Sequence, residues 1–157
     1  MMNRNFLPRA VLAAILLALP AAADAPRNPP QYAQFDSDSV TIVDNFTHLE
    51  WDRRAIVRAQ SYSLTDAGCG FSLGNTGRLP SIKELLTILD EEPHNEYEFG
   101  KVVPKMIDAL AFADTPVDLP YWSSTPAGAG MHWTLSFRTG LMQALPDGSA
   151  ALGRCVR

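Results

Sequence analysis

The stretch GRCVR, residues 153–157, closes the sequence and contains one of only two cysteines among 157 residues. The other is Cys69, so a single intramolecular disulfide, Cys69–Cys155, is possible. In an oxidising compartment an even number of cysteines usually means pairing. Such a bond would hold a terminus that otherwise frays, and closing so long a loop removes at most about 4–5 kcal/mol of unfolded-state freedom. The alternative, a reactive thiol or a metal-binding pair, has neither a CxxC spacing nor a nearby basic cluster to support it.

The N-terminus predicts the compartment. Arg4 and Arg9 come before an unbroken apolar run over residues 10–19, and small residues follow, with a cleavage site after Ala23. Ten apolar residues are too few to cross a hydrocarbon core about 30 Å thick. Positive charge, run length and cleavage site favour a secretory signal peptide over residues 1–23 and disfavour a buried N-terminal helix. We therefore expect a periplasmic or secreted protein.

The remainder is long enough for one domain with a sizeable core. Residues 24–38 are rich in proline and polar residues and predict an extended leader, which leaves residues 39–157 as the domain. Loss of Arg4 and Arg9 makes the mature chain more acidic than the formal net charge of −4 for the whole sequence. An acidic chain argues against nucleic acid and anionic membrane surfaces as main partners. No later stretch is apolar enough to predict a membrane span.

Two patterns predict secondary structure in the first third of the domain. Residues 40–43 and 46–52 alternate as two strands joined by a turn at residues 44–45. A short helix is expected to begin with Ser63 as its cap and to end near Cys69, before a glycine-rich loop.

The clearest helix follows that loop. Ser81 and Glu84 match a capping box, in which each side chain satisfies an exposed backbone donor of the other residue. One apolar stripe then follows at helical spacing: Ile82, Leu85, Leu86 and Leu89. Pro93 is expected to end this helix.

The second half predicts a polar loop, one or two helical turns and several strands. Residues 94–101 are polar, and a short helix is expected to start near Pro104. Runs typical of strands then follow at 119–125, 131–137, 141–145 and 152–157, separated by turn residues. The order of hairpin, helices and strands predicts an α+β fold, a mostly antiparallel sheet with two helices. The first and last strands are expected to share one sheet.

Six of these segments, in this order, resemble the C-terminal domain of collagen-like bacterial adhesins, the Lcl C-terminal domain family. They are VTIVDNFTHLEW, GRLPSIKELLTILDE, IDALAFADTP, YWSST, HWTLSF and GRCVR. The resemblance covers nearly all of residues 39–157. It implies a C-type-lectin-like fold with paired termini and a loop-rich upper half. It also implies a bond between Cys69 and Cys155, and a binding module without a shared catalytic activity.

The segment LDEEPHNE, residues 89–96, contains the candidate binding residues. Asp90, Glu91 and Glu92 crowd the C-terminal end of a predicted helix, where the helix dipole favours cations instead. Together with Asn95 they offer the hard oxygen ligands that calcium prefers, so calcium is a possible cofactor and this segment a possible ligand site. The alternative interpretation is a solvated acidic loop. No other metal or cofactor is predicted.

Other chemistry-bearing residues have simpler explanations. GFSLG, residues 70–74, matches the pattern of a serine hydrolase at Ser72, but a nucleophile elbow needs a preceding strand and a following helix, which are not predicted here. The tryptophans are expected in the core rather than as sugar-stacking platforms: Trp51, Trp122 and Trp133. Three arginines could bind a sulfate or carboxylate group, and the alternative is a solvated face: Arg53, Arg54 and Arg58.

These observations predict an exported, non-catalytic recognition module of the bacterial cell envelope. Its partner is expected to be a glycan or another envelope protein. A structural or assembly domain of an envelope complex is the first alternative, and a small hydrolase that uses Ser72 is the second.

Overall fold

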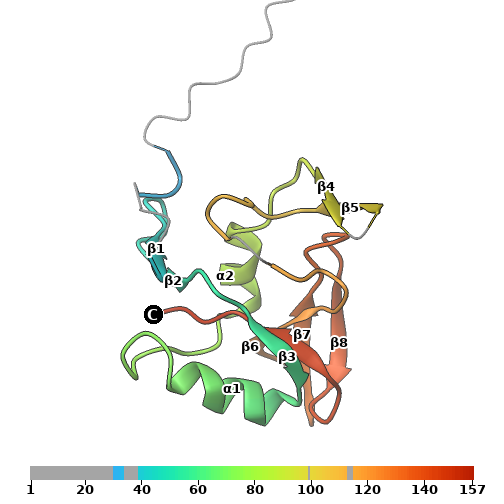
Figure 1. Ribbon diagram of the computed structural model, residues 1–157. Helices are drawn as coiled ribbons and strands as arrows, with labels where there is room; N and C mark the ends of the chain where they lie inside the picture. The colour runs from blue at the N-terminus through green and yellow to red at the C-terminus, as the bar shows by residue number, and fades with distance from the viewer. Residues whose placement is uncertain (1–29, 34–38, 99, 113–114) are drawn as a thin grey trace, which may run out of the picture.

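The computed structural model describes residues 30–33, 39–98, 100–112 and 115–157 (Figure 1). The predicted signal peptide, residues 1–23, lies outside the described residues, as does most of the leader. The strands and helices follow in the order β1 (Thr41–Val43), β2 (Glu50–Asp52), β3 (Ile56–Gln60), α1 (Tyr62–Gly70), α2 (Ile82–Thr87), β4 (His94–Glu98), β5 (Lys101–Lys105), β6 (Tyr121–Gly128), β7 (Met131–Leu135), β8 (Met142–Pro146) and β9 (Ala151–Gly153). The predicted α+β class, with two helices and mostly antiparallel strands, is confirmed.

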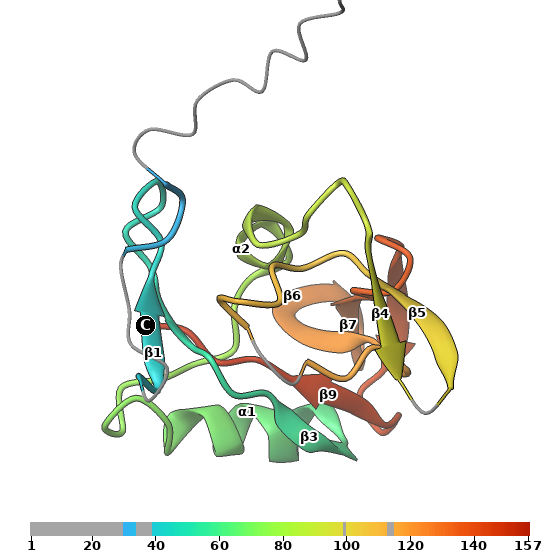
Figure 2. The same ribbon diagram turned by 45° about the horizontal axis from the view of Figure 1, so that its top comes forward.

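The largest sheet has five strands in the order β3-β9-β6-β7-β8. All neighbours are antiparallel except β6 and β9, which run parallel with Tyr121 opposite Leu152. Helix α1 lies along β3 and β9 (Figures 1 and 2). The helix approaches so closely that a Cβ on Gly153 would collide with the methyl group of Thr65. Strand β9 therefore lies between β3 and β6 within the sheet, and α1 packs closely against it.

The first two strands form a hairpin of their own, outside the five-stranded sheet that contains β9. The predicted pairing of the first and last strands holds only for the end of the predicted last strand: Val156 bridges to Trp51, and the amide of Asp52 donates to the carbonyl of Cys155 at 2.9 Å. Strand β9 itself pairs with β6 and with β3, and sequence patterning missed β3. The second strand is also shorter than residues 46–52, because the Asp44 carboxylate accepts from the amides of Phe46 and Thr47 and extends the turn. His48 completes that turn with a positive φ of 58°.

A second hairpin, β4–β5, occupies the segment where a polar loop and a helix were expected. All five residue pairs are in register, from His94 opposite Lys105 to Glu98 opposite Lys101. Pro104 lies within β5, so the prediction that it begins a helix is wrong. Proline restricts the residue before it to extended backbone, and Val102 and Val103 favour the same conformation.

The chain's end is fastened to the β1–β2 hairpin (Figure 1). Val156 bridges to both Trp51 and Arg78, and the amide of Glu50 donates to the carbonyl of Arg157 at 3.0 Å. The predicted disulfide joins Cys69 to Cys155, with Cα atoms 5.2 Å apart. Residues 155–157, which we call the tail, thus connect the end of α1 to the β1–β2 hairpin, through the disulfide on one side and backbone hydrogen bonds on the other.

Both helices begin close to their predicted starts. Ser81 caps α2, and its capping box with Glu84 is present as expected. The helix ends at Thr87, well before Pro93; Ile88 forms a turn, and the residues that follow it are irregular. Helix α1 starts two residues before the expected position: the N-cap is Ser61, whose backbone carbonyl accepts from Thr65.

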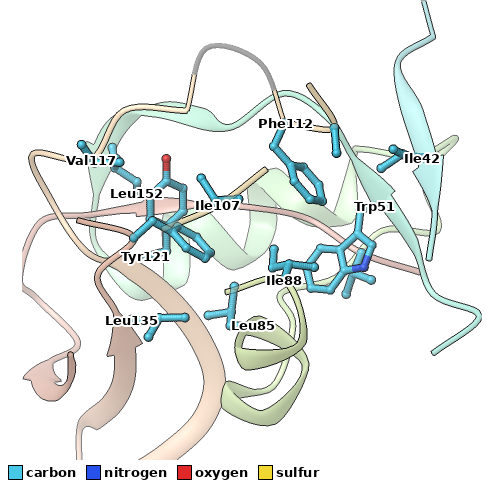
Figure 3. Packing of buried hydrophobic residues seen from close by; sticks show 13 residues of the cluster. Ile42, Trp51, Leu85, Ile88, Ile107, Phe112, Val117, Tyr121, Leu135 and Leu152 are labelled. Carbon is cyan, nitrogen blue, oxygen red and sulfur yellow. The ribbon is translucent and has the colours of Figure 1, made fainter. Parts of the chain in front are cut away.

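The main core lies between α2, the sheet and the chain segment around Ile107 (Figure 3). Trp51 and Phe112 pack edge to face, with ring centroids 6.4 Å apart. A smaller cluster surrounds the disulfide and includes Trp122. The expected burial of tryptophan is confirmed for Trp51 and Trp122, which are both fully buried, and Trp133 is half-buried.

Candidate functional site

The acidic segment emerges directly after α2. The amide of Asp90 donates to the carbonyl of Met106 at 2.9 Å, which ties the segment to the chain beyond β5. One carboxylate oxygen of Asp90 accepts from the amide of Glu92 at 2.9 Å, and the other lies 2.8 Å from Nε2 of His94. Asp90 therefore holds the shape of the turn, while Glu91 and Glu92 are exposed.

A hollow of about 410 Å³ opens beside this segment, and we call it the acidic hollow. Three of the four predicted binding residues line it, namely Asp90, Glu91 and Glu92. The other lining residues are Gln31, Tyr32, Phe46, Ile88, Leu89 and Asp108. Asn95 is not among them, because it lies in β4 opposite Pro104.

A second hollow, of about 370 Å³, adjoins the first. Asp90, Glu92 and Asp108 line both hollows, and His94 and Leu110 contribute to the second alone. Three carboxylates thus lie on the border between two concave surfaces. An occupant of either hollow would meet the same negative charge.

Two aromatic side chains also line the acidic hollow. The Phe46 side chain is 62% exposed, at the turn of the β1–β2 hairpin. Tyr32 is half-buried, and its ring packs edge to face on Phe112 at 5.4 Å. Burial raises the pKa of Tyr32, and the carboxylates of Asp108 and Asp44 raise it further. The Tyr32 hydroxyl therefore keeps its proton, and its ability to donate a hydrogen bond, to a higher pH than an ordinary tyrosine does.

Sequence reasoning missed Tyr32, Phe46 and Asp108, because they come from three segments that only the fold brings together. Gln31 marks the connection: its side chain donates to the carbonyl of Thr87 at 2.8 Å, across the end of α2. The described part of the leader, residues 30–33, thus contributes to the site. No local pattern in the sequence indicates this contact.

The geometry suits a ligand with hydroxyl or cationic groups. Carboxylates accept hydrogen bonds from such groups, and the Phe46 ring offers an apolar surface. One carboxylate oxygen of Asp108 is already engaged within the protein, since Oδ1 accepts hydrogen bonds from the amides of Leu110 and Ala111 at 2.8 and 3.0 Å. Within the described residues, no three His, Cys, Asp or Glu side chains converge in a metal-binding arrangement. Calcium binding therefore stays a prediction.

Ser72 lacks the setting of a hydrolase nucleophile. It follows helix α1 rather than a strand, and its hydroxyl donates to the carbonyl of Cys69 at 2.9 Å. The hollow that Ser72 lines is bordered by carboxylates, arginines and apolar residues, with no histidine among the described residues that line it.

The three arginines that sequence reasoning considered together have separate roles. Arg53 is buried and donates to the carbonyls of Ser39, Leu110 and Ala111. It is thus a structural residue, not part of a solvated face. Arg54 and Arg58 are exposed, in agreement with that interpretation.

Neither helix in the described part of the chain has the length and hydrophobicity needed to span a bilayer. The sequence matches the model of the Lcl C-terminal domain over residues 40–157. The chain therefore belongs to the Lcl C-terminal domain family, as the resemblance indicated. Among curated proteins, none matches the sequence.

Proposed function

We propose that this member of the Lcl C-terminal domain family is an exported, non-catalytic recognition module of the bacterial cell envelope. Its ligand is a glycan or another envelope protein, bound in the acidic hollow. The proposal includes cleavage after Ala23, an extended leader, and the C-type-lectin-like fold that the family resemblance implies. Family membership and the Cys69–Cys155 bond support export and binding.

One observation supports the binding site above all others. The exposed acids Glu91 and Glu92 line the same concave surface as the exposed Phe46 ring. Such a combination of apolar surface and a few directed polar groups is typical of ligand sites. The carboxylates would accept from hydroxyl or ammonium groups of the ligand, and the ring would cover its apolar face.

The test uses two charge-matched double variants of the mature protein. E91Q/E92Q removes two charges from the acidic hollow, and D66N/D118N removes two exposed charges elsewhere. Each protein is applied to a glycan array with and without calcium, and is used to pull down partners from the native envelope. We expect E91Q/E92Q to lose binding at least tenfold and D66N/D118N to behave like the wild type. Equal binding by both variants would contradict the proposed site.

The comparison with and without calcium tests whether the acidic segment binds its ligand through a calcium ion. If Asp90, Glu91, Glu92 and Asn95 coordinate calcium, chelation abolishes binding and added calcium restores it. Binding that is unchanged by chelation would remove calcium from the proposal and leave direct recognition by the carboxylates.

A structural role in an envelope complex is the second candidate, and the β4–β5 hairpin favours it. Tyr97 and Val102 lie opposite each other in this hairpin and are 77% and 60% exposed. The other hairpin face contains Glu96, which pairs with the buried Lys105 at 2.5 Å. If the protein is an assembly domain, the Y97S/V102S variant should lose its envelope partners in the pull-down, whereas E91Q/E92Q should keep them.

A further inference from the structure

We propose a second binding site, for an uncharged saccharide, between the loop after α1 and the β1–β2 hairpin. This site shares no residue with the acidic hollow and does not depend on the proposed function there. A hollow of about 530 Å³ lies at this place, and we call it the loop hollow. The lining residues that bear on its chemistry are Thr41, Glu50, Asp52, Arg54, Phe71 and Arg157.

One of the residues that line the loop hollow, Phe71, has a largely exposed aromatic ring. Phe71 follows the last residue of α1 and is 79% exposed. Exposure of a whole phenyl ring forgoes the stabilisation that burial of such a side chain provides, about 1.5–3 kcal/mol. A flat apolar surface next to polar groups can pack against the C–H face of a sugar ring while the polar groups bind its hydroxyls.

The loop that holds Phe71 is internally fastened. The Ser72 hydroxyl donates to the carbonyl of Cys69 at 2.9 Å, and the amide of Gly77 donates to the carbonyl of Ser72 at 3.2 Å. Three consecutive residues, Leu73, Gly74 and Asn75, have positive φ values of 51°, 71° and 65°. Left-handed backbone is costly for leucine, so the surrounding contacts must impose it.

The terminal stretch of the chain supplies those contacts. Cys155 bonds the end of α1 at Cys69, and Arg157 donates from Nη1 to the carbonyl of Leu73 at 3.0 Å. The loop is thus held in place before any ligand arrives. Preorganisation of this kind reduces the entropy lost on binding.

The charges in the loop hollow are balanced, and this balance indicates the class of ligand. Arg157 pairs with Glu50 at 2.8 Å, and Nε of Arg54 lies 3.6 Å from Asp52. Because the two guanidinium groups and the two carboxylates offset each other, neither an anionic group such as sulfate or phosphate nor a cation gains a net electrostatic attraction here. A hydroxyl group accepts from a guanidinium and donates to a carboxylate, so it suits both kinds of partner.

The orientation of Arg54 supports this assignment. Its side chain is 73% exposed, and Asp52 already accepts from the Arg54 backbone amide at 3.0 Å. The carboxylate of Asp52, whose side chain is 12% exposed, is therefore held in place, while the Arg54 side chain reaches solvent, and both residues line the hollow. The Asp52 carboxylate can accept a hydrogen bond from one hydroxyl of a sugar ring, and the Arg54 guanidinium can donate one to a neighbouring hydroxyl.

The experiment is a ¹H–¹⁵N correlation titration of the ¹⁵N-labelled mature protein with three neutral probes: chitotriose, cellotriose and mannotriose. At least one probe is expected to shift the amides of residues 71–74 and Thr41. Phe71→Ala should weaken that probe at least tenfold, and Phe71→Trp should keep it. Leu64→Ala truncates an apolar side chain of α1 that is 60% exposed and lies in neither hollow, and it should leave the titration unchanged.

Three results would overturn the proposal. The first is that none of the three probes shifts residues 71–74, and the second is equal affinity for wild type and Phe71→Ala. The third is a response of these residues to a heparin hexasaccharide or to inorganic phosphate alone, which would show an anion site. The spectrum of each variant reports its folding directly. The E91Q/E92Q variant separates the two sites, because it should lose the ligand of the acidic hollow and still bind the neutral probe.

Discussion

Arg154 donates from Nη1 to the backbone carbonyls of Asp52 and Arg53, each at 3.0 Å, across a separation of about a hundred residues. Its Nη2 donates to the Thr115 hydroxyl at 2.7 Å, and its guanidinium lies 4.7 Å from the centre of the Phe112 ring. The side chain is fully buried. Burial lowers the pKa of Arg154. The buried guanidinium of Arg154 thus connects the C-terminal residues to the end of β2.

Arg154→Met should destabilise the domain by about 3 kcal/mol or more, since it leaves two buried carbonyls and a buried hydroxyl without their donor. Denaturant unfolding monitored by tryptophan fluorescence measures the difference. Arg58→Met, at an exposed position of β3, is the control and should change the free energy of unfolding by less than about 0.5 kcal/mol. Equal effects of the two substitutions would refute this role of Arg154.

The disulfide should contribute up to about 4–5 kcal/mol, because it closes a loop of 86 residues in the unfolded chain. The double variant C69S/C155S should therefore unfold at much lower denaturant concentration than the oxidised protein. The reduced wild type is the matched control and should resemble the variant. An unchanged midpoint for both would show that the bond does not stabilise this fold.

Stability should also fall in acid through Glu84. The bidentate pair with Arg78, at 2.6 and 2.9 Å, and the capping bonds of Ser81 lower the pKa of Glu84 from 4.5 to about 2. A lowered pKa means that this contribution is complete above pH 4.5 and is lost as the pH falls towards 2. The melting temperatures of wild type and Glu84→Gln should differ at pH 7 and converge near pH 2. A constant difference across this range would contradict the assignment.

Gly77 should not tolerate a side chain. A Cβ there would collide with the Ser72 hydroxyl and lie 2.5 Å from the carbonyl of Cys69. Gly77→Ala should cost about 1–3 kcal/mol and should shift the amides of the loop that holds Phe71. The control is Gly148→Ala, where no atom lies within 4 Å of the new Cβ. If both variants keep wild-type stability, the tight closure of this loop is incorrect.

Sequence patterns predicted those parts of the fold that depend on residues close together in the sequence or on a simple residue count. The Ser81–Glu84 capping box lies within one helical turn, so it was readable from two residues and their spacing. The disulfide followed from a count of two cysteines and the expectation of export. Burial of Trp51 and Trp122 followed from their apolar neighbours.

The missed features depend on partners distant in sequence. Strand β3 contains the exposed residues Val57 and Arg58 and pairs only with β9, so no alternation marks it. The β4–β5 hairpin has polar residues in most of its first strand and a proline in its second, which together suggested a loop and a helix start. Arg154 is charged, and burial of a charged residue is visible only when its acceptors are placed around it.

The candidate site shows the same division. The acidic run after α2 stands out in the sequence because its charges oppose the helix dipole. Phe46 and Tyr32 reach the acidic hollow because the β1–β2 hairpin and the described part of the leader pack against the end of α2. Phe71 was hidden in a glycine-rich loop whose conformation depends on Arg157 and the disulfide.

The decisive measurement is the intact mass, without reduction, of the protein isolated from its native envelope or medium. The expected mass is that of a chain that begins at Asp24 and is two hydrogens lighter than the same chain with free thiols. A mass that retains residues 1–23, or one that corresponds to free thiols at Cys69 and Cys155, would contradict an exported domain closed by its own tail.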